Sequence, residues 1–343
     1  MNHLADTASG AVAEKAQVLA AHAQYLITTA ARAPSVHNTQ PWRFHVGAGT
    51  VELWCDTGRK LRSDPIGRQM LISCGAALFG LRLAVRSLGY QPVVERLPDE
   101  SQLRLLARVS VGARVPMNAL EHQMLAAVPH RHTHRGPFTT GPLPPGLLAG
   151  LQHDALAEGA TLALVEHGLG YERLASIVAT AALRGDLDPV AKTEIRKWTR
   201  DALSAARDGI PATSLPEGSP GHIPHGRLRQ RDFDLGRYLA RLPGGGKEDE
   251  TGAAPAATAV LLTSGDRRVD WLRAGQALQR LLLHAASKWV FASMYTQPLE
   301  DLVTRTLIRD RLALPGNPQM VLQFGPAVSA ASTARRPPEE LTD

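Results

Sequence analysis

The sequence is poor in cysteine and in aromatic residues, and both shortages narrow the class of protein. The 343 residues include only two cysteines, Cys55 and Cys74, too few for a disulfide framework. Because isolated cysteines suit a reducing compartment, we expect a cytoplasmic protein. Aromatic residues make up 5% of the chain, which offers no basic and aromatic platform for nucleic acid. The net charge of +6 comes from dispersed residues, so we expect no nucleic-acid partner.

Long apolar runs are also missing. No stretch approaches the roughly 18 uninterrupted apolar residues of a membrane-spanning helix, so we expect no membrane partner. Residues 1–15 have neither a basic segment nor an apolar core, and we therefore expect no secretory signal. The apolar content of 44% is ordinary for a globular chain, and 343 residues suffice for two structural units.

Hydrophobic periodicity predicts helices and short strands along most of the chain. Apolar residues recur at helical spacing in several segments, and short alternating runs predict strands between them. The predicted helices span residues 11–32, 66–88, 117–128, 269–288 and 298–312, with three more between 144 and 207. The predicted strands span residues 42–46, 51–55, 92–96, 103–109, 161–166, 259–263 and 319–324.

Two of these helices resemble each other. The run GAALFGLRLAVRS, from Gly75, aligns without a gap on GQALQRLLLHAAS, from Gly275, at an offset of 200 residues. Apolar helices can match this well by chance, but the match suggests two related halves. Residues 208–257, called the insertion below, are rich in Gly, Pro and Ser. A segment of that length without a regular pattern is a flexible linker or a functional lid.

Two polar segments invite a ligand. Residues 33–44, APSVHNTQPWRF, hold more hydrogen-bonding side chains than a connecting loop needs. Residues 129–138, PHRHTHRGPF, alternate arginine with histidine. In an extended segment Arg131, Thr133 and Arg135 share one face, and two guanidinium groups beside a hydroxyl suit a phosphate monoester. A solvated basic turn is the alternative.

The histidines of residues 129–138 suggest a metal site as an alternative interpretation. They would share the opposite face of an extended segment, and H-x-H spacing can bind zinc. The flanking positive charges disfavour a dication, so we predict no metal. The residues of this alternative are His130, His132 and His134, with His222 and His225 from the insertion.

Two further segments are ambiguous alone. Arg335 and Arg336 stand beside a rigid Pro-Pro near the C-terminus, where a disordered tail is the simpler interpretation. Gln297 precedes Pro298 at a predicted helix start, and free backbone N–H groups at such a start can donate to an electron-rich ligand atom. Plain helix initiation is the alternative.

Taken together, these segments resemble the FMN-dependent nitroreductase family, and within it the mycobacterial Acg-type branch of NAD(P)H nitroreductases. The ordered matches are PSVHNTQPW at 34–42, RHTHR at 131–135, TQPLE at 296–300 and RRP at 335–337. The resemblance implies an α+β fold of two fused halves, residues 1–115 and 116–343. Each half would hold an antiparallel sheet flanked by helices, so that one chain forms a pseudo-dimer and can be monomeric.

In that family, two subunits build each flavin site. Here neither half contains all the segments that such a site needs, and each half contains the segments that the other lacks. The resemblance therefore implies one FMN per chain and names no catalytic acid or base. The FMN phosphate would be held by Arg131, Thr133, Arg135, Arg335 and Arg336. The ribityl chain or ring would be lined by Pro34, Ser35, Asn38 and Gln40, and flavin N5 would face the backbone of Gln297, Pro298 and Leu299.

The resemblance implies a ping-pong oxidoreductase. Hydride would pass from NAD(P)H to FMN and then to a small-molecule acceptor such as a nitroaromatic or a quinone. The alternative is an FMN-sequestering protein whose insertion stays closed over the flavin and prevents turnover. Lys288 and Trp289 stand where relatives often have glycine, which would alter packing near the N5 loop.

Overall fold

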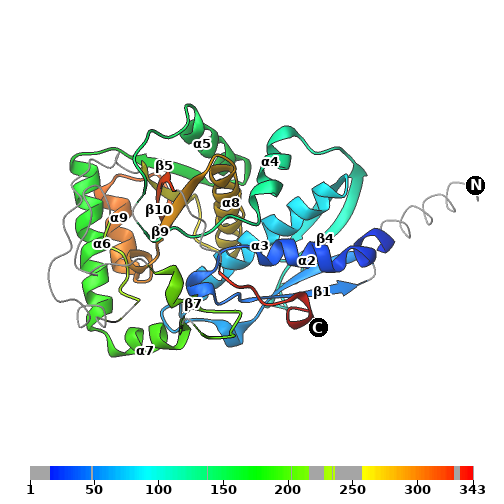
Figure 1. The fold of residues 1–343 in the computed structure, drawn as a ribbon, viewed down its shortest axis with the longest axis horizontal. Helices are drawn as coiled ribbons and strands as arrows, with labels where there is room; N and C mark the ends of the chain where they lie inside the picture. The colour runs from blue at the N-terminus through cyan, green and yellow to red at the C-terminus, as the bar shows by residue number, and fades with distance from the viewer. Residues whose placement is uncertain are drawn as a thin grey trace, which may run out of the picture.

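The computed structural model shows two α+β lobes on either side of a central pair of helices, α3 (Arg68–Ser87) and α8 (Arg268–Ser287) (Figure 1). This arrangement confirms the predicted α+β class with a sheet in each half. The structure describes residues 16–47, 49–136, 138–201, 203–215, 228–233, 235, 257–327 and 333–342.

The first lobe is built on a four-stranded antiparallel sheet in the order β1-β2-β4-β3. Side chains of β2 alternate between buried and partly exposed, because one face of the sheet meets the core and the other meets solvent. The predicted strands 42–46 and 51–55 are confirmed and pair as a hairpin, with Trp42 opposite Cys55 and Val46 opposite Val51. The elements of this lobe are α2 (Ala23–Ala31), η1 (Val36–Asn38), β1 (Trp42–Gly47), β2 (Thr50–Cys55), η2 (Thr57–Arg59), β3 (Tyr90–Arg96), β4 (Leu105–Arg114) and α4 (Ala119–Ala127).

The second lobe has a four-stranded antiparallel sheet in the order β5-β8-β10-β9. Its central strands are buried on both faces, because Leu174, Val178 and Ile308 from two covering helices pack on the outer face. The elements are α5 (Leu147–Ala157), β5 (Thr161–Val165), α6 (Leu169–Leu187), α7 (Pro189–Trp198), β6 (Thr199–Arg200), β7 (Ile210–Pro211), η3 (Ala212–Ser214), β8 (Ala257–Thr263), β9 (Val290–Tyr295), η5 (Gln297–Leu299), α9 (Leu302–Arg311) and β10 (Asn317–Pro326). The last element, η6 (Pro338–Glu340), lies in the C-terminal segment, which packs on the first lobe.

The two lobes repeat one topology. In each, two strands precede the central helix and two follow it, and the strand orders β1-β2-β4-β3 and β5-β8-β10-β9 correspond position by position. The central helices themselves begin and end exactly 200 residues apart. The internal similarity read from the sequence is therefore a structural repeat.

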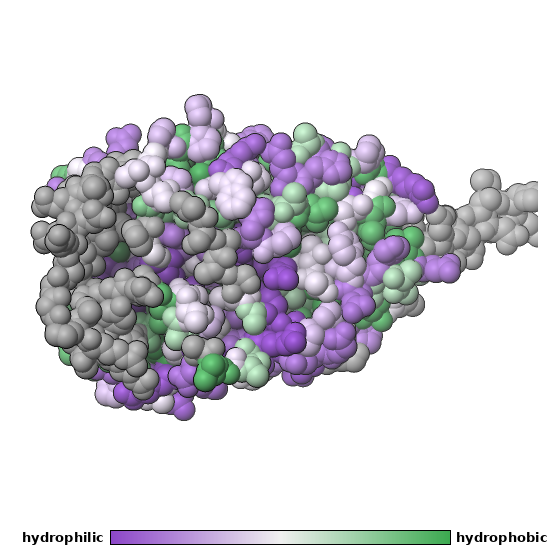
Figure 2. Space-filling model, viewed as in Figure 1, coloured by the Kyte–Doolittle hydropathy of each residue, from purple (hydrophilic) through white to green (hydrophobic). Residues whose placement is uncertain are grey.

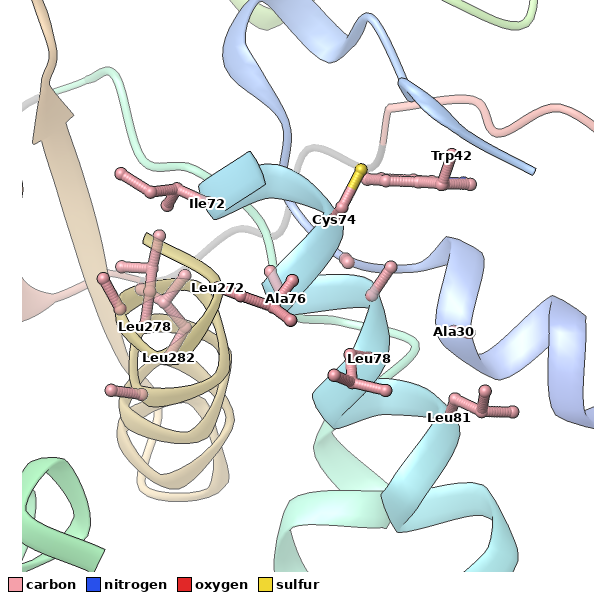
Figure 3. Close-up of a cluster of buried hydrophobic side chains, with 14 of the residues drawn as sticks. Ala30, Trp42, Ile72, Cys74, Ala76, Leu78, Leu81, Leu272, Leu278 and Leu282 are labelled. Carbon is pink, nitrogen blue, oxygen red and sulfur yellow. The ribbon is translucent and has the colours of Figure 1, made fainter. Parts of the chain in front are cut away.

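The central helices touch backbone to backbone where the two glycines of the repeat meet. A Cβ built on Gly75 would lie 2.2 Å from the carbonyl oxygen of Leu272, and one on Gly275 would lie 2.0 Å from that of Ile72. The two contacts mirror each other, as expected at a pseudo-two-fold axis. Glycine is required here because no side chain fits between the helices. Figure 3 shows Leu272 of α8 reaching Ala76 of α3 beside this crossing.

Helix α3 is the core of the molecule. It is long and apolar enough to cross a membrane by length and composition, but 83% of its apolar window is buried inside the protein. Leu78 and Leu81 lie on the side of α3 toward α2, and Cys74 lies beside Trp42 (Figure 3). Its apolar composition therefore reflects packing on both α2 and α8. On the face shown in Figure 2, hydrophobic residues lie scattered among hydrophilic ones.

The C-terminal segment, residues 333–342, leaves the second lobe and packs on the first (Figure 1). The N–H of Phe44 in β1 donates to the carbonyl oxygen of Leu341 at 2.7 Å, and the Leu341 side chain is fully buried. Arg335 and Arg336 therefore do not lie in a free tail.

Two local expectations from the sequence are wrong in detail. Strand β9 was not predicted, and its burial on both faces explains why no alternating pattern marked it. The predicted helix 298–312 is a 3-10 turn, η5, followed by α9, because the Asp301 side chain caps a new helix start at the Val303 N–H. For residues 129–136 the sequence left an extended segment or a turn open; they form no regular strand, and Thr133 forms a single bridge with Ala292 of β9.

Candidate functional site

A cavity opens where the first lobe meets the second, and several segments distant in sequence converge there. It holds about 580 Å³ including its open mouth. Four parts of the chain contribute: residues 33–44, called the polar loop below; residues 129–136, called the arginine segment; strand β9 with η5; and the insertion. Its lining residues are Ser35, Val36, His37, Thr133, His134, Arg135, Ile210, Gln230, Arg231, Phe233, Met294, Tyr295, Thr296 and Gln297.

The polar loop is held in an unusual backbone conformation. His37, Asn38 and Gln40 have φ values of +52°, +54° and +49°, a region that non-glycine residues rarely occupy. The Ser35 hydroxyl stabilises the loop by accepting the N–H of Gln40 at 2.9 Å. Backbone strain of this kind is held in place by surrounding contacts and is common at binding sites.

The Asn38 and Gln40 side chains provide those surrounding contacts. Asn38 Nδ2 donates to the carbonyl oxygens of Gly209 (3.0 Å) and Ala334 (3.1 Å). Gln40 is fully buried, donates to the carbonyl oxygen of Arg207 and accepts the N–H of Arg336. The two amides thus join the loop to the insertion and to the C-terminal segment. Neither side chain lines the cavity, so both position the loop and do not face the cavity.

Four arginines gather beside the cavity without a carboxylate. Arg131, Arg135 and Arg335 lie close enough to one another and to Arg32 that their charges repel. None of the four forms an ion pair with any residue that the structure describes. Arg131 is 6% exposed, and its Nε and Nη1 atoms find no hydrogen-bond partner in the described parts of the chain. Its Nη2 donates to the carbonyl oxygen of Arg32 at 3.1 Å.

Burial makes this cluster electrostatically costly. Desolvation, with the charges of Arg32 and Arg135, lowers the pKa of Arg131 to about 10. Desolvation alone lowers the pKa of Arg135 to about 10, and burial with the neighbouring arginines holds the pKa of Arg335 well below its ordinary value. Desolvated cations of like sign, with donors unused, form a site for an anion with several oxygen atoms.

Backbone contacts fix the arginine segment against both lobes. The N–H of His134 donates to the carbonyl oxygen of Ala292 at 2.9 Å, and the Ser293 hydroxyl donates to that of His134. Arg335 is fixed from the first lobe, because its guanidinium donates to the carbonyl oxygens of Ala31 and Ala33. The predicted partners Arg131, Thr133, Arg135 and Arg335 therefore do converge.

Arg336 does not join the arginine cluster and bonds to Glu340 in the C-terminal segment. Its Nε donates to Glu340 at 3.2 Å, and its Nη2 donates to the Glu340 carbonyl oxygen at 2.6 Å. Burial lowers its pKa, as does the charge of Arg59. The structure thus places Arg336 in the C-terminal turn, and of the predicted basic pair only Arg335 joins the cluster.

The turn η5 offers one backbone donor to the cavity. Pro298 has no N–H, and the N–H of Leu299 already donates to Thr296. Gln297 lines the cavity, so its N–H is the donor of this turn that can serve a ligand. Pro34, Pro298 and Leu299 are buried behind the lining residues.

Arg68, at the start of α3, supports this turn from the other lobe. Its guanidinium is buried and donates to the carbonyl oxygen of Leu299 (2.9 Å) and to both the backbone and side-chain oxygens of Gln319. Burial, together with Arg305, lowers the pKa of Arg68 to about 10. Sequence inspection missed Arg68 because nothing in the local pattern of α3 distinguishes it.

The insertion also contributes residues that sequence inspection missed. Arg231 pairs with Glu300, directly after η5, and both side chains are largely buried. Phe233 packs edge-on against His37 at 5.7 Å between ring centroids and lies over the Arg135 guanidinium. Residues 216–227, which include His222 and His225, and residues 236–256 of the insertion lie outside the described residues.

The histidine run packs against aromatic rings. His130 stacks on Trp289 and His132 packs on Phe291, whereas His134 stacks on Phe138. Across the residues that the structure describes, no group of three or more His, Cys, Asp or Glu side chains could hold a metal ion.

The fold and the site define a two-lobed α+β protein with an arginine cluster beside a cavity between its halves. "Putative NAD(P)H nitroreductase Rv3131" from Mycobacterium tuberculosis is 34% identical over 324 residues, covering 92% of this chain and 89% of the relative. "Uncharacterized protein Rv3127" from the same organism is 31% identical over 323 residues, covering 91% and 90%. "Putative NAD(P)H nitroreductase acg" is 28% identical over 321 residues, covering 92% and 93%. The chain belongs to this family of NAD(P)H nitroreductases.

Solved structures give more distant similarities. The FMN-dependent nitroreductase NfnB from Mycobacterium smegmatis, in complex with NADPH, is 17% identical with a TM-score of 0.38, covering 65% of this chain and 98% of that chain. A nitroreductase-like family protein from Bacillus cereus is 14% identical with a TM-score of 0.35, covering 66% and 96%. At these TM-scores the overlap carries no conclusion about this chain. A comparison with models of protein families finds no match.

Proposed function

We propose that the protein is an FMN-dependent oxidoreductase that takes hydride from NAD(P)H and reduces a nitroaromatic, quinone or similar acceptor in a ping-pong reaction. The observation that carries this proposal is the cluster of four arginines beside the cavity, in which Arg131 is buried and none of the four forms an ion pair with a described residue. The names of the relatives agree with it, since two of them are called NAD(P)H nitroreductases.

The residues present fit FMN. A phosphate monoester would satisfy the unused Nε and Nη1 atoms of Arg131 and neutralise the charges of Arg135 and Arg335. Thr133 adds a hydroxyl on the cavity wall, and Ser35 and Gln297 face the same space. FMN would supply the two-electron chemistry that links a nicotinamide donor to an acceptor.

The chain's own groups then have separate tasks. The arginines bind the phosphate, and the polar loop and η5 orient the group between the lobes. The N–H of Gln297 donates to an electron-rich atom of the bound group, and Arg68 fixes the turn that carries this N–H. Residues of the insertion, such as Ile210 and Phe233, exclude water from the cavity.

We propose one such site per chain. At the corresponding position of the other half, the end of α5, Glu158 is buried and accepts from Arg82 (2.6 Å) and Arg280 (3.2 Å). Asp154 accepts from Arg280 as well. Because internal carboxylates already neutralise these arginines, that position offers no comparable anion site. We also propose a cytoplasmic location, which the two free, buried cysteines support.

A second candidate is an FMN-sequestering protein with little turnover. It is favoured by the contacts that fix the insertion over the cavity, namely Arg231 to Glu300 and Arg229 to Asp186. The latter pair is 3.0 Å apart. An insertion held in this way would hinder access of nicotinamide and acceptor.

Spectroscopy separates these candidates. We expect purified protein to be yellow, with a flavin spectrum corresponding to one FMN per chain. Anaerobic stopped-flow mixing with NADPH and with NADH should bleach the flavin if the protein is an oxidoreductase. A stable flavin spectrum with both donors would favour sequestration, and its bleaching after Arg231→Met would show that the insertion limits access. Colourless protein that does not bind added FMN would reject both candidates.

A further inference from the structure

His37 is a buried imidazole to which the proposed flavin site gives no role. Its side chain is 5% exposed, it lines the cavity, and its Nε2 atom has no hydrogen-bond partner among the residues that the structure describes. An unsatisfied buried polar atom costs about 1–3 kcal/mol, so such atoms call for an explanation. A ligand in the cavity would supply the missing partner.

The position of His37 is rigid. Its φ of +52° is fixed by the contacts of the following residue, because Asn38 donates to the carbonyl oxygens of Gly209 and Ala334. On the cavity side, the ring packs edge-on against Phe233 of the insertion. The loop backbone and the Phe233 ring therefore restrict where the imidazole can lie, which a specific hydrogen bond to a ligand requires.

The charge state of His37 is also defined. Burial is the main cause that lowers its pKa well below 6.5, and the guanidinium groups of Arg231 and Arg135 lower it further. The ring is therefore neutral at physiological pH, with one N–H donor and one acceptor nitrogen. With its proton on the unpartnered Nε2, the tautomer that the proposal below requires, it can donate a hydrogen bond without adding a further charge beside the arginines.

The cavity selects the kind of atom that this N–H meets. Arg135 and Arg231 are donors only, and among the described lining residues there is no aspartate or glutamate. A ligand here must present acceptor atoms. The remaining wall includes flat or apolar side chains, namely Val36, Phe233 and Tyr295, which favour a planar aromatic body.

We propose that His37 binds the electron acceptor, its ring N–H donating to a nitro or carbonyl oxygen of a planar aromatic molecule. This assignment rests on the proposed function, because it places the acceptor in the cavity beside the flavin. His37 is then a specificity residue: it favours aromatic compounds that carry a hydrogen-bond-accepting oxygen over aromatic hydrocarbons of the same shape.

The test uses His37→Phe, which keeps an aromatic ring against Phe233 and removes both nitrogens. Isothermal titration calorimetry would measure the Kd of nitrobenzene and of cumene, its hydrocarbon analogue, on the full-length protein as purified. We expect His37→Phe to weaken nitrobenzene roughly 3- to 10-fold, the effect of one hydrogen bond, and to leave cumene unchanged. His37→Asn, which tolerates positive φ and keeps an N–H donor, should lose less nitrobenzene affinity than His37→Phe.

Three results would overturn the proposal: unchanged nitrobenzene affinity in His37→Phe, an equal loss for both compounds, or no nitrobenzene binding by the wild type. An equal loss would mean that His37 only shapes the cavity. The visible spectrum of the same samples reports separately on the proposed function. A colourless wild type would reject the flavin site, whereas yellow His37→Phe protein with wild-type nitrobenzene affinity would reject only the role of His37.

Discussion

Arg131→Met tests the arginine cluster through an unusual pair of effects, since it should stabilise the ligand-free protein while weakening FMN. Methionine has a similar length and no charge. In the ligand-free protein Arg131 is 6% exposed and two of its nitrogens lack partners among the described residues. A buried, unpaired charge destabilises the fold until an anion arrives.

The magnitude follows from the pKa of Arg131, which burial lowers from 12.5 to about 10. At about 1.4 kcal/mol for each pH unit by which a pKa moves, the folded state carries a penalty of about 3 kcal/mol. The substitution also removes the hydrogen bond to Arg32, worth about 1 kcal/mol. We therefore expect a net gain of about 2 kcal/mol. For a chain of this length that gain raises Tm by about 3 °C.

The FMN affinity should change in the opposite direction. Loss of charge-assisted hydrogen bonds, each worth about 1.5–3 kcal/mol, should weaken FMN by roughly 10- to 100-fold. Calorimetric unfolding of the ligand-free protein and fluorescence titration with FMN measure the two effects. Arg131→Lys is the matched control, since it keeps the charge and should show no gain in Tm. A lower Tm together with wild-type FMN affinity in Arg131→Met would refute the reasoning.

Three further predictions concern the support of the site. Gly275→Ala should destabilise the protein by about 1–3 kcal/mol, because its Cβ would meet the carbonyl oxygen of Ile72. Gly170→Ala in α6 is the control: the nearest atom to its Cβ lies at 3.9 Å, so it should be neutral or stabilising. Denaturant unfolding measures both. Arg68→Met should lower stability by about 2–3 kcal/mol. Three buried oxygens of Leu299 and Gln319 lose their donor, at about 1–3 kcal/mol each, and this outweighs the gain of about 3 kcal/mol from removing a buried charge whose pKa is about 10. Equal midpoints in urea would contradict this. His37 stays neutral in the folded state but titrates near pH 6.5 when unfolded, so stability should fall by up to about 1.4 kcal/mol per pH unit as pH drops below about 6.5. His37→Asn should flatten that part of the stability profile, and an unchanged slope would show that His37 does not cause it.

Most of the fold could be predicted from the sequence, because the strongest local patterns coincide with the packed elements. The helical repeat at an offset of 200 residues identified α3 and α8, and hence the two halves, since their shared glycines are required by close contact. Strand β9 escaped prediction because a strand buried on both faces shows no alternation. The split of η5 from α9 depends on a cap at Asp301 that competes with Pro298 as the helix start.

The site was predictable only in part, for a different reason. Motif matches indicated Arg131, Arg135 and Arg335, which do converge. They could not show that Gln40 is engaged by Arg207 and the Arg336 backbone, because that contact depends on where the insertion crosses the loop. The sequence did not indicate His37, Arg68 and Arg231, because their roles depend on contacts with residues distant in sequence.

The two halves share a topology but differ in whether carboxylates neutralise their buried arginines. This difference explains why the position beside the polar loop is the one suited to an anionic ligand. Where α5 ends, Glu158 neutralises Arg82 and Arg280, so that half is complete without a bound anion. Beside the polar loop, Arg131 and Arg335 have no carboxylate partner among the described residues, so that half remains electrostatically incomplete. The proposal of one site per chain rests on this imbalance. Stability and binding are opposed at the proposed site, because the charges that would attract a phosphate are the ones that burial makes costly.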